Sequence, residues 1–332
     1  MRDPRYLTEM PDPPMHEVMS GHLGQSMDGY REVCCLSAAM DLNLFEMMTS
    51  GRTSEEVGGE LGTDSVLLRP LLDILTGMGL LTRDGDRYTV SRTARVYLTD
   101  GSPYCQKERF RSVLKRLDGW NRIADRIMGE YADDDGFDPV PWIVNIGQNA
   151  MSGDIQETLA FLRGAVDLSG CRTLLDVGGG HGLYSIAFSH AYPGLRCTVF
   201  DRPEITPVTR RNAEEYGTEI GIQEGDYYEV GFDGSFDIVF ISYNMAAMDP
   251  ELTGRVSAAV NPGGYVIIRH SVLTGDSPFD FVEWNSRSAK GGRRRPEFSE
   301  YLDSAREHGL EVMLTERLKG HTELVVLRKR SD

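Results

Sequence analysis

Four glycines within five positions follow an apolar run in the stretch LLDVGGGHGLYS, residues 174–185. Glycine has no Cβ, so a loop built from it can turn tightly and bring its backbone close to a ligand. The residues before the loop are typical of a buried strand, and those after it are typical of a helix. This arrangement can hold three classes of ligand: a nucleoside triphosphate, a dinucleotide, or an adenosyl-sulfonium cofactor.

An acidic residue follows each of the first three predicted strands in this half of the chain. Asp176 stands directly before the glycines, Asp201 ends the next apolar run, and Asp226 lies in the stretch EGDYYE. Three acids so placed suit a ligand with an amino group, a ribose and an adenine amine, and Tyr227 can cover a ring face. No Lys-Ser or Lys-Thr pair follows the glycines, so the triphosphate class is excluded.

The spacing of the glycines favours the sulfonium cofactor over the dinucleotide. The pattern is GxGxG, not the GxGxxG of dinucleotide-binding folds. S-adenosylmethionine has no pyrophosphate to hold, but it carries an ammonium group that a carboxylate can attract. We expect Asp176, Gly178 and Gly180 to contact the methionine end of the cofactor. Asp201 should contact its ribose, and Asp226 and Tyr227 its adenine.

Composition limits the class of protein. The chain has 332 residues, enough for two domains with cores, and a net charge of −16, which argues against a nucleic-acid partner. We expect no membrane span and no signal peptide, because no long apolar run occurs. Five cysteines without CxxC spacing and seven histidines without an HExxH motif predict reduced thiols, a cytoplasmic location and no metal site.

Strands and helices alternate from about residue 155 onward. The predicted strands are 172–177, 196–201, 219–226, 236–242 and 264–270, and two further runs between about 310 and 328 can complete the sheet. Apolar strands separated by helices are typical of an α/β fold with a parallel, doubly wound sheet.

The N-terminal third has a different pattern. We expect a helix over residues 30–49, buried on several sides, then a short helix from Ser54 to Gly62 and a second helix capped by Asp64 or Ser65. A hairpin around an Asp-Gly turn at 79–90 completes a winged-helix pattern. Residues 1–110 hold 11 basic and 17 acidic residues, so we expect contacts with protein and not with DNA.

Over nearly its whole length the chain resembles the dimeric O-methyltransferases of the plant caffeate and acetylserotonin type and their bacterial antibiotic-tailoring relatives. The stretches LLDVGGGHG, VFDRPEI and GDYYE match that family's cofactor motifs in order and spacing, and IGQNAMSGD is similar to its Asn-x-Ala-Met stretch at the active site. The resemblance implies S-adenosylmethionine as cofactor, a small-molecule acceptor and a homodimer. It adds Arg202 and Ser242 to the cofactor residues and places Met151 and Met245 near the acceptor.

The resemblance also implies the domain organisation. Residues 1–100 correspond to a winged-helix-like dimerisation domain, 101–155 to a helical linker region, and 156–332 to a Rossmann-like class I methyltransferase domain.

The chain departs from the family's catalytic pattern. Ala246, Ala247 and Met248 stand where the family has His, Asp and Trp, and that His is its general base. Two family glutamates align with His270 and Arg294. These changes predict an acceptor that is anionic or already nucleophilic.

Three residues are the catalytic candidates that remain. His270 is a base or an orienting group, Arg294 contacts an anion, and Tyr243 donates to the cofactor or acceptor. The alternatives are transfer to carbon, sulfur or nitrogen on the same fold, or a regulatory or scaffold protein that binds the cofactor without catalysis.

Overall fold

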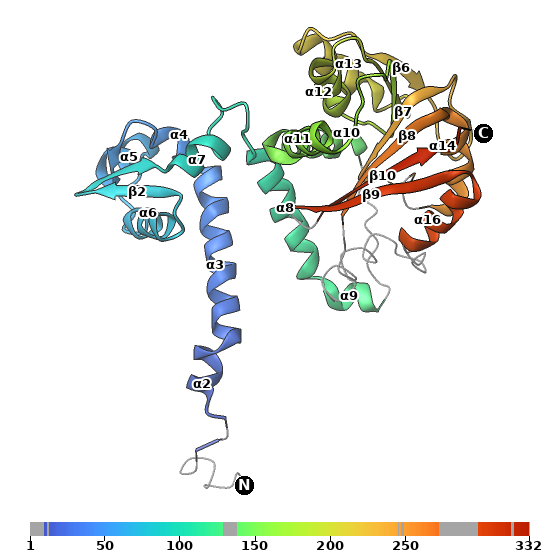
Figure 1. Ribbon diagram of the computed structural model, residues 1–332. Coiled ribbons are helices and arrows are strands. Elements are labelled where there is room, and N and C mark those ends of the chain that lie inside the picture. Colours follow the sequence, from blue (N-terminus) through green and yellow to red (C-terminus); the bar gives the residue numbers. More distant parts are fainter. Residues whose placement is uncertain are drawn as a thin grey trace. The chain divides into compact units, whose positions relative to one another are not determined.

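A computed structural model describes residues 10, 11, 13–128, 138–244, 246, 249–271, 298–319 and 322–331. Its chain forms two compact units, residues 1–119 and 120–332, each with its own elements (Figure 1). In the described part of the chain, none of the helices combines the length and the apolar character that crossing a membrane requires.

The first unit is mainly helical with a small sheet. Its elements are α2 (Met15–Ser20), α3 (His22–Asp41), α4 (Leu44–Met47), β1 (Arg52–Thr53), α5 (Ser54–Leu61), α6 (Leu68–Gly77), β2 (Leu81–Asp84), β3 (Arg87–Val90) and α7 (Arg92–Tyr97). The three strands form an antiparallel sheet in the order β1-β3-β2, and the hairpin expected at 79–90 is confirmed as the β2–β3 pair.

Two details of this unit differ from the sequence prediction. The helix expected over 30–49 is α3, which starts earlier and ends at Asp41, and Asn43 then takes a left-handed φ of 54° before α4. Within 30–49 the buried apolar side chains lie between Ala39 and Met48, whereas Tyr30 is exposed, so the expected burial was wrong for the first part of the range. The cap predicted at Asp64 or Ser65 was also wrong, because α6 starts after Leu67 without a side-chain cap.

The second unit carries the larger sheet. Helix α8 (Lys107–Trp120) belongs to the first unit except for its last residue. The second unit then starts with α9 (Ile123–Ile127), α10 (Pro139–Asn149), the π-helical turn η1 (Ala150–Asp154) and α11 (Ile155–Ala165). The strands are β4 (Thr173–Val177), β5 (Arg196–Asp201), β6 (Gly221–Glu224), β7 (Phe236–Ser242), β8 (Val260–Ser271), β9 (Leu310–Leu318) and β10 (Thr322–Lys329). The helices between them are α12 (Leu183–Ala191), α13 (Thr206–Glu215), η3 (Pro250–Leu252), α14 (Thr253–Ala259) and α16 (Phe298–Glu307).

The seven strands run in the order β6-β5-β4-β7-β8-β10-β9. The first five are parallel, as their apolar runs predict, but β10 is antiparallel to both β8 and β9. The sheet is therefore mixed, and the expectation of a parallel sheet was wrong for β10, the one strand of these seven that runs in the opposite direction.

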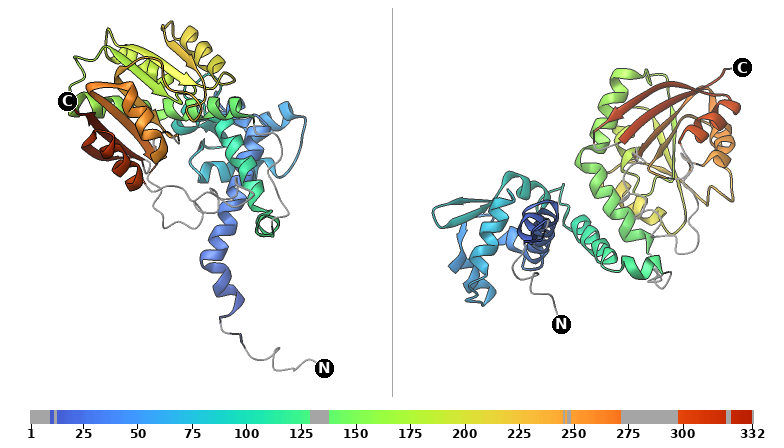
Figure 2. Two further views of the ribbon diagram at one scale, coloured as in Figure 1. Left: turned by 90° about the vertical axis from the view of Figure 1, so that its right-hand side faces the viewer. Right: turned by 90° about the horizontal axis from the view of Figure 1, so that it is seen from below.

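Helices lie on both faces of this sheet (Figure 2), and apolar clusters fill the space between them and the strands. On one face β4, β7 and β8 pack against α14 and α16, with Val177, Ile241 and Ile268 in the cluster. On the other face the same strands pack against α11 and α12 through Leu174, Phe240 and others. Because both faces are covered, polar groups at the carboxyl edge of the strands are the ones left to meet a ligand.

Candidate functional site

The glycine loop lies at the point where the order of the strands reverses. The chain passes from β4 to β5 and β6 on one side, and β7 lies on the other side of β4. Loops that diverge at such a point leave a crevice at the carboxyl ends of the strands, which is where open α/β sheets bind ligands. Gly178 and Gly180 have φ of 63° and 55°, a conformation that residues with a Cβ rarely adopt.

Asp201, at the end of β5, is joined to this loop by its carboxylate. The Gly180 N–H donates to Asp201 Oδ2 at 2.8 Å, and the Arg202 N–H donates to Oδ1 at 2.7 Å. Burial raises the pKa of this carboxyl, and the two backbone donors oppose that effect. Each carboxylate oxygen can accept a second hydrogen bond, so the pair of hydroxyls of a ribose suits this group.

Asp176 lies beneath the loop and not on its open side. Its side chain is 1% exposed, and its Oδ2 accepts from Ser185 Oγ at 2.9 Å. Oδ1 has no hydrogen-bond partner within the described residues, and a Cβ on Gly179 would come within 2.7 Å of this carboxyl. Burial raises the pKa of Asp176 to about 7. A buried acceptor without a partner fits a ligand that brings an ammonium group, so contact with the methionine end stays a prediction.

The segment after β6 places Asp226 and Tyr227 together. Asp226 Oδ1 accepts from the Tyr228 N–H at 2.8 Å, and Gly225 donates its N–H to the Asp201 carbonyl at 3.0 Å. The Tyr227 ring is half-buried against the core, 4.9 Å from the Tyr228 ring, and burial raises its pKa to about 12. An acid and a ring face side by side can hold an adenine by its amine and its plane.

The turn after β7 lies at the carboxyl end of the strand next to β4, on the side away from β5. Ser242 ends the strand, Tyr243 follows with a left-handed φ of 52°, and Asn244 donates from Nδ2 to the Val177 carbonyl at 2.6 Å. A Cβ on Gly178 would lie 2.8 Å from that same Nδ2. Asn244 thus bridges β7 and the glycine loop, a role that no sequence motif indicated.

Met151 lies on the π-helical turn η1 and faces α13. Its sulfur lies 3.7 Å from the hydroxyl of Tyr216. Helix α10, which leads into this turn, packs closely on the loop, since a Cβ on Gly147 would meet the His181 side chain at 3.0 Å. Contact between Met151 and an acceptor therefore remains a prediction.

His270 lies near the carboxyl end of β8, on the face covered by α16. Its ring centroid is 4.0 Å from that of Phe298, and its Nε2 is 3.3 Å from Glu323 Oε2 on the adjacent strand β10. Ala246, which we predict to stand where the family has its base, is 1% exposed and belongs to the apolar cluster of that same face. A histidine and a carboxylate thus meet on the face that carries Ala246.

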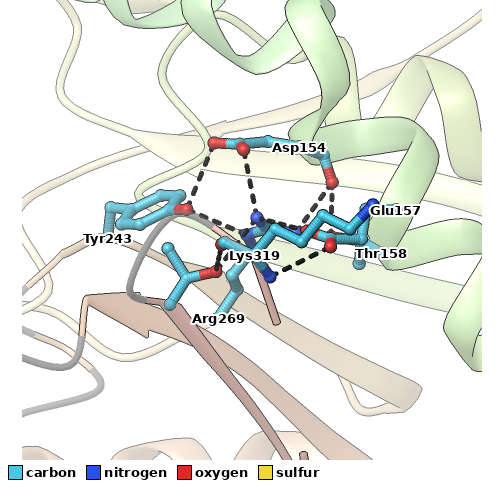
Figure 3. Close-up of polar contacts among 7 residues, drawn as sticks. Asp154, Glu157, Thr158, Tyr243, Arg269 and Lys319 are labelled. Atoms are coloured by element: carbon cyan, nitrogen blue, oxygen red, sulfur yellow. Dashed lines mark hydrogen bonds and ion pairs between the residues drawn. The ribbon is translucent and has the colours of Figure 1, made fainter. Parts of the chain in front are cut away.

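Arg269 is a buried ion-pairing residue that the sequence reasoning missed. Its guanidinium contacts Asp154, Glu157, Thr158, Tyr243 and Thr322, and its side chain is fully buried (Figure 3). Tyr243, a predicted catalytic residue, is part of this group. A charged residue inside the apolar run YVIIRH was the available signal, since arginine is rarely buried unless it is paired. The acidic partners lie more than a hundred residues earlier, and no local pattern marks them.

Some predicted residues lie outside the described part of the chain. They are Met245, Ala247, Met248 and Arg294. Their proposed contacts with the acceptor stay predictions. Arg202 is described and exposed, and its side chain pairs with Glu204 at 3.0 Å.

Two protein families match this chain. Residues 147–289 match the O-methyltransferase domain, and residues 25–100 match the O-methyltransferase dimerisation domain. Together they span the two units, with the glycine loop, Asp201, Asp226 and His270 inside the first match.

Individual proteins agree with these matches. The chain is 32% identical over 239 residues to acetylserotonin O-methyltransferase of Mus musculus, covering 62% of this chain and 60% of that protein. It is 26% identical over 301 residues to L-tyrosine C(3)-methyltransferase of Streptomyces lavendulae, covering 77% of this chain and 78% of that one. The crystal structure of human N-acetylserotonin methyltransferase in complex with SAM has a TM-score of 0.74 at 20% identity, covering 93% of this chain and 96% of that chain, so the two share a fold.

Proposed function

This chain belongs to the O-methyltransferase family, S-adenosylmethionine-dependent enzymes that act on small molecules, and from that premise we propose how its own residues hold the cofactor and the acceptor. Asp201 binds the ribose hydroxyls, because its carboxylate lies against the backbone of Gly180. Asp226 and Tyr227 bind the adenine. The methionine end lies over Gly178 and Gly180, toward Asp176 and Ser242.

The acceptor binds between the ends of β7 and β8, on the face of α16. When bound, the sulfonium supplies an electrophilic methyl group, and its departure as a thioether needs no acid. The protein has then to position the acceptor and, for a hydroxyl, to remove its proton. Ala246 cannot do this, and we assign that task to His270 beside Glu323.

The observation that carries this assignment is the 3.3 Å contact between His270 Nε2 and Glu323 Oε2. This contact has the distance of an ion pair and not the geometry of a hydrogen bond, so Glu323 acts on the imidazole through its charge. A carboxylate beside the ring stabilises the imidazolium that forms when His270 takes the proton of the acceptor. Arg294 then contacts an anionic group of the acceptor, and Met151 and Met245 line its pocket.

Acceptors of different nucleophilicity test this assignment. The full chain is given S-adenosylmethionine with a panel of phenols, thiols, carboxylic acids and amines, and methylated products are detected by mass. We expect His270→Gln to lower kcat/KM for a phenol by about 10²-fold or more, with little effect on an acceptor that is already ionised. The control is His190→Gln, an exposed histidine of α12 that hydrogen-bonds to Thr218. Equal phenol turnover by wild type and His270→Gln contradicts the assignment.

Transfer to carbon is the main alternative. The name of the Streptomyces lavendulae relative states methylation of a tyrosine ring carbon, and that protein covers much of this chain. The same panel detects transfer to carbon, sulfur or nitrogen. If no acceptor is methylated while the cofactor binds, the chain is a cofactor-binding regulatory or scaffold protein.

The assembly and location are also proposals. The dimerisation-domain match at 25–100 and the exposed apolar side chains of α2 and α3 support a homodimer through residues 1–100. The helices and hairpin at 54–90 fit a winged helix, and a helical linker region over 101–155 separates it from the methyltransferase domain at 156–332. Five free cysteines support the cytoplasm, and the net charge of −16 argues against nucleic-acid and anionic membrane partners.

A further inference from the structure

Arg269 gathers polar groups from four elements in the interior of the second unit. Its Nη1 donates to the Asp154 carbonyl at 2.8 Å and to Thr158 Oγ1 at 2.6 Å, and its Nη2 lies 3.1 Å from Asp154 Oδ1 and 3.2 Å from Glu157 Oε2. Nη2 also donates to Thr322 Oγ1 at 3.2 Å. A buried charge needs such partners, because the interior solvates it poorly.

One arm of this group holds Tyr243 at two points. The Arg269 carbonyl accepts from the Tyr243 N–H at 2.9 Å, and Arg269 Nε donates to the Tyr243 hydroxyl at 2.9 Å. That hydroxyl donates in turn to Asp154 Oδ2 at 3.2 Å. The φ of 52° at Tyr243 is rare for a residue with a large side chain. Such conformations persist where the surroundings hold them in place, and they concentrate at functional sites.

Tyr243 is the central residue of the turn 242–244, at the carboxyl end of β7. Ser242 precedes it, and Asn244 follows it and hydrogen-bonds to the Val177 carbonyl at the base of the glycine loop. The left-handed step at Tyr243 sets the direction in which Asn244 leaves the strand. A change at Tyr243 therefore reaches Gly178, against which the Asn244 amide packs.

The second arm holds the π-helical turn. Asp154 ends η1, the turn that carries Met151, and it is bound by Arg269 through both its carbonyl and its carboxylate. Ser152 and Gly153 have non-helical backbone angles within η1, so the turn is not held by helical geometry alone. In Figure 3, Asp154 of η1 and Tyr243 of the turn after β7 both point toward the Arg269 guanidinium.

We propose that Arg269 is a positioning residue of the methyltransferase site, which fixes the turn 242–244 and the turn η1 relative to each other. The cofactor side and the Met151 side of the site are then held by one buried cation, which itself touches neither ligand. This inference rests on the proposed cofactor site at the glycine loop.

Two hydrogen-bond deletions at the same guanidinium test it. Tyr243→Phe keeps the ring but removes the hydroxyl that joins the turn 242–244 to the guanidinium. Thr322→Val, the matched control, removes a hydroxyl of the same guanidinium on the side of β10. Calorimetric titration of the full-length variants with S-adenosylhomocysteine should give a Kd raised about fivefold to tenfold by Tyr243→Phe and less than about twofold by Thr322→Val.

Variants of Arg269 separate positioning from stability. Arg269→Lys keeps a cation for Asp154 and Glu157, but it lacks the planar fork that reaches Tyr243 and η1 together. We expect Lys to recover part of the Tm lost in Arg269→Met, without recovering the affinity for S-adenosylhomocysteine. If Arg269→Lys recovers the Tm and the affinity for S-adenosylhomocysteine to the same extent, the proposal is contradicted.

The outcomes distinguish this inference from the function on which it rests. If the wild type binds and Tyr243→Phe and Thr322→Val change Kd equally, the positioning role of Arg269 is contradicted. The proposed cofactor site is then unaffected. A wild-type chain that does not bind S-adenosylhomocysteine contradicts the proposed cofactor site and this inference with it.

Discussion

At the scale of the residue, Gly180 shows how the loop couples backbone geometry to ligand binding. Its φ is 55°, its N–H donates to Asp201, and a Cβ would lie 3.2 Å from Ile143 Cδ1. Gly217 has a similar φ of 59° with nothing within 4 Å of an added Cβ. Alanine at Gly217 therefore introduces backbone strain alone, whereas alanine at Gly180 introduces backbone strain and crowding within the loop.

We expect Gly180→Ala and Gly217→Ala each to lose about 1 kcal/mol of stability, because both force alanine into the left-handed region. Only Gly180→Ala should also weaken binding of S-adenosylhomocysteine, by about tenfold or more, since the new methyl group displaces the loop from Asp201. Urea unfolding and calorimetry measure the two effects. Equal affinities in both variants would show that the loop tolerates a side chain.

Asp176 makes stability depend on pH. Burial raises the pKa of its carboxyl to about 7, whereas the unfolded chain has a value near ~4. The folded state therefore holds this proton more tightly. The stability that this group contributes is fully present below pH ~4 and is lost as the pH rises toward about 7.

Asp176→Asn should remove this dependence. Relative to the wild type, the variant should gain free energy of unfolding between pH 5 and pH 8, by roughly 3 kcal/mol at most, because about two pKa units of the shift fall in that range. The measurement is urea unfolding at several pH values. For the control, Asp167→Asn at an exposed position, the difference in free energy of unfolding from the wild type should stay constant over the same pH range. A flat difference for Asp176→Asn would mean that the carboxyl ionises normally beneath Gly179.

At the scale of the element, helix α5 shows which parts of a local prediction the sequence decides. The helix starts at Ser54, as expected, and Thr53 caps it in a capping box, accepting from the Glu56 N–H while Glu56 accepts from Thr53. The start of α6 was not predictable in this way, because no side chain caps it and packing of Leu72 and Leu75 determines its position.

Thr53→Ala should cost the first unit about 1 kcal/mol, because the Glu56 N–H loses its partner, the Thr53 hydroxyl. Thermal unfolding followed by circular dichroism detects this loss, and Thr49→Ala, whose hydroxyl donates to the Glu46 carbonyl, is a control outside the cap. The affinity for S-adenosylhomocysteine should stay at its wild-type value, since the cap lies in the other unit. An unchanged Tm would mean that packing alone holds α5.

The strands of the second unit were predictable for a physical reason. Runs such as FDIVFIS are mostly apolar with no alternation of apolar and polar residues, which is typical of a strand covered on both faces. The antiparallel direction of β10 was not predictable, because direction depends on the connection between strands and not on the residues within them. Arg269, Asp154 and Asn244 were missed for a similar reason, since their contacts join segments far apart in the sequence.

At the scale of the whole molecule, the exposed face of α2 and α3 bears on assembly. Leu23 and Met27 lie four residues apart in α3 and are 52% and 41% exposed, and Met19 at the end of α2 is 40% exposed. Two side chains four residues apart lie on one face of a helix. Such a face within the matched dimerisation region fits contact with a second copy.

The wild-type chain should behave as a dimer of twice 37.0 kDa in light scattering after size exclusion. Leu23→Glu with Met27→Glu should shift it toward the monomer, because two charges would be buried at the contact. The control is Val66→Glu, an exposed apolar position in the same unit but outside α3. A dimer that survives the double substitution would place the contact elsewhere.

The loop after β4, together with Asp201, is our proposed binding site for S-adenosylmethionine. The most direct measurement is a calorimetric titration with S-adenosylhomocysteine of the wild type, of Asp201→Ala and of the exposed control Asp233→Asn, with NAD as a second ligand. We expect micromolar binding by the wild type and the control, loss of binding in Asp201→Ala, and no heat from NAD. Binding retained by Asp201→Ala, or absent from the wild type, would contradict the account.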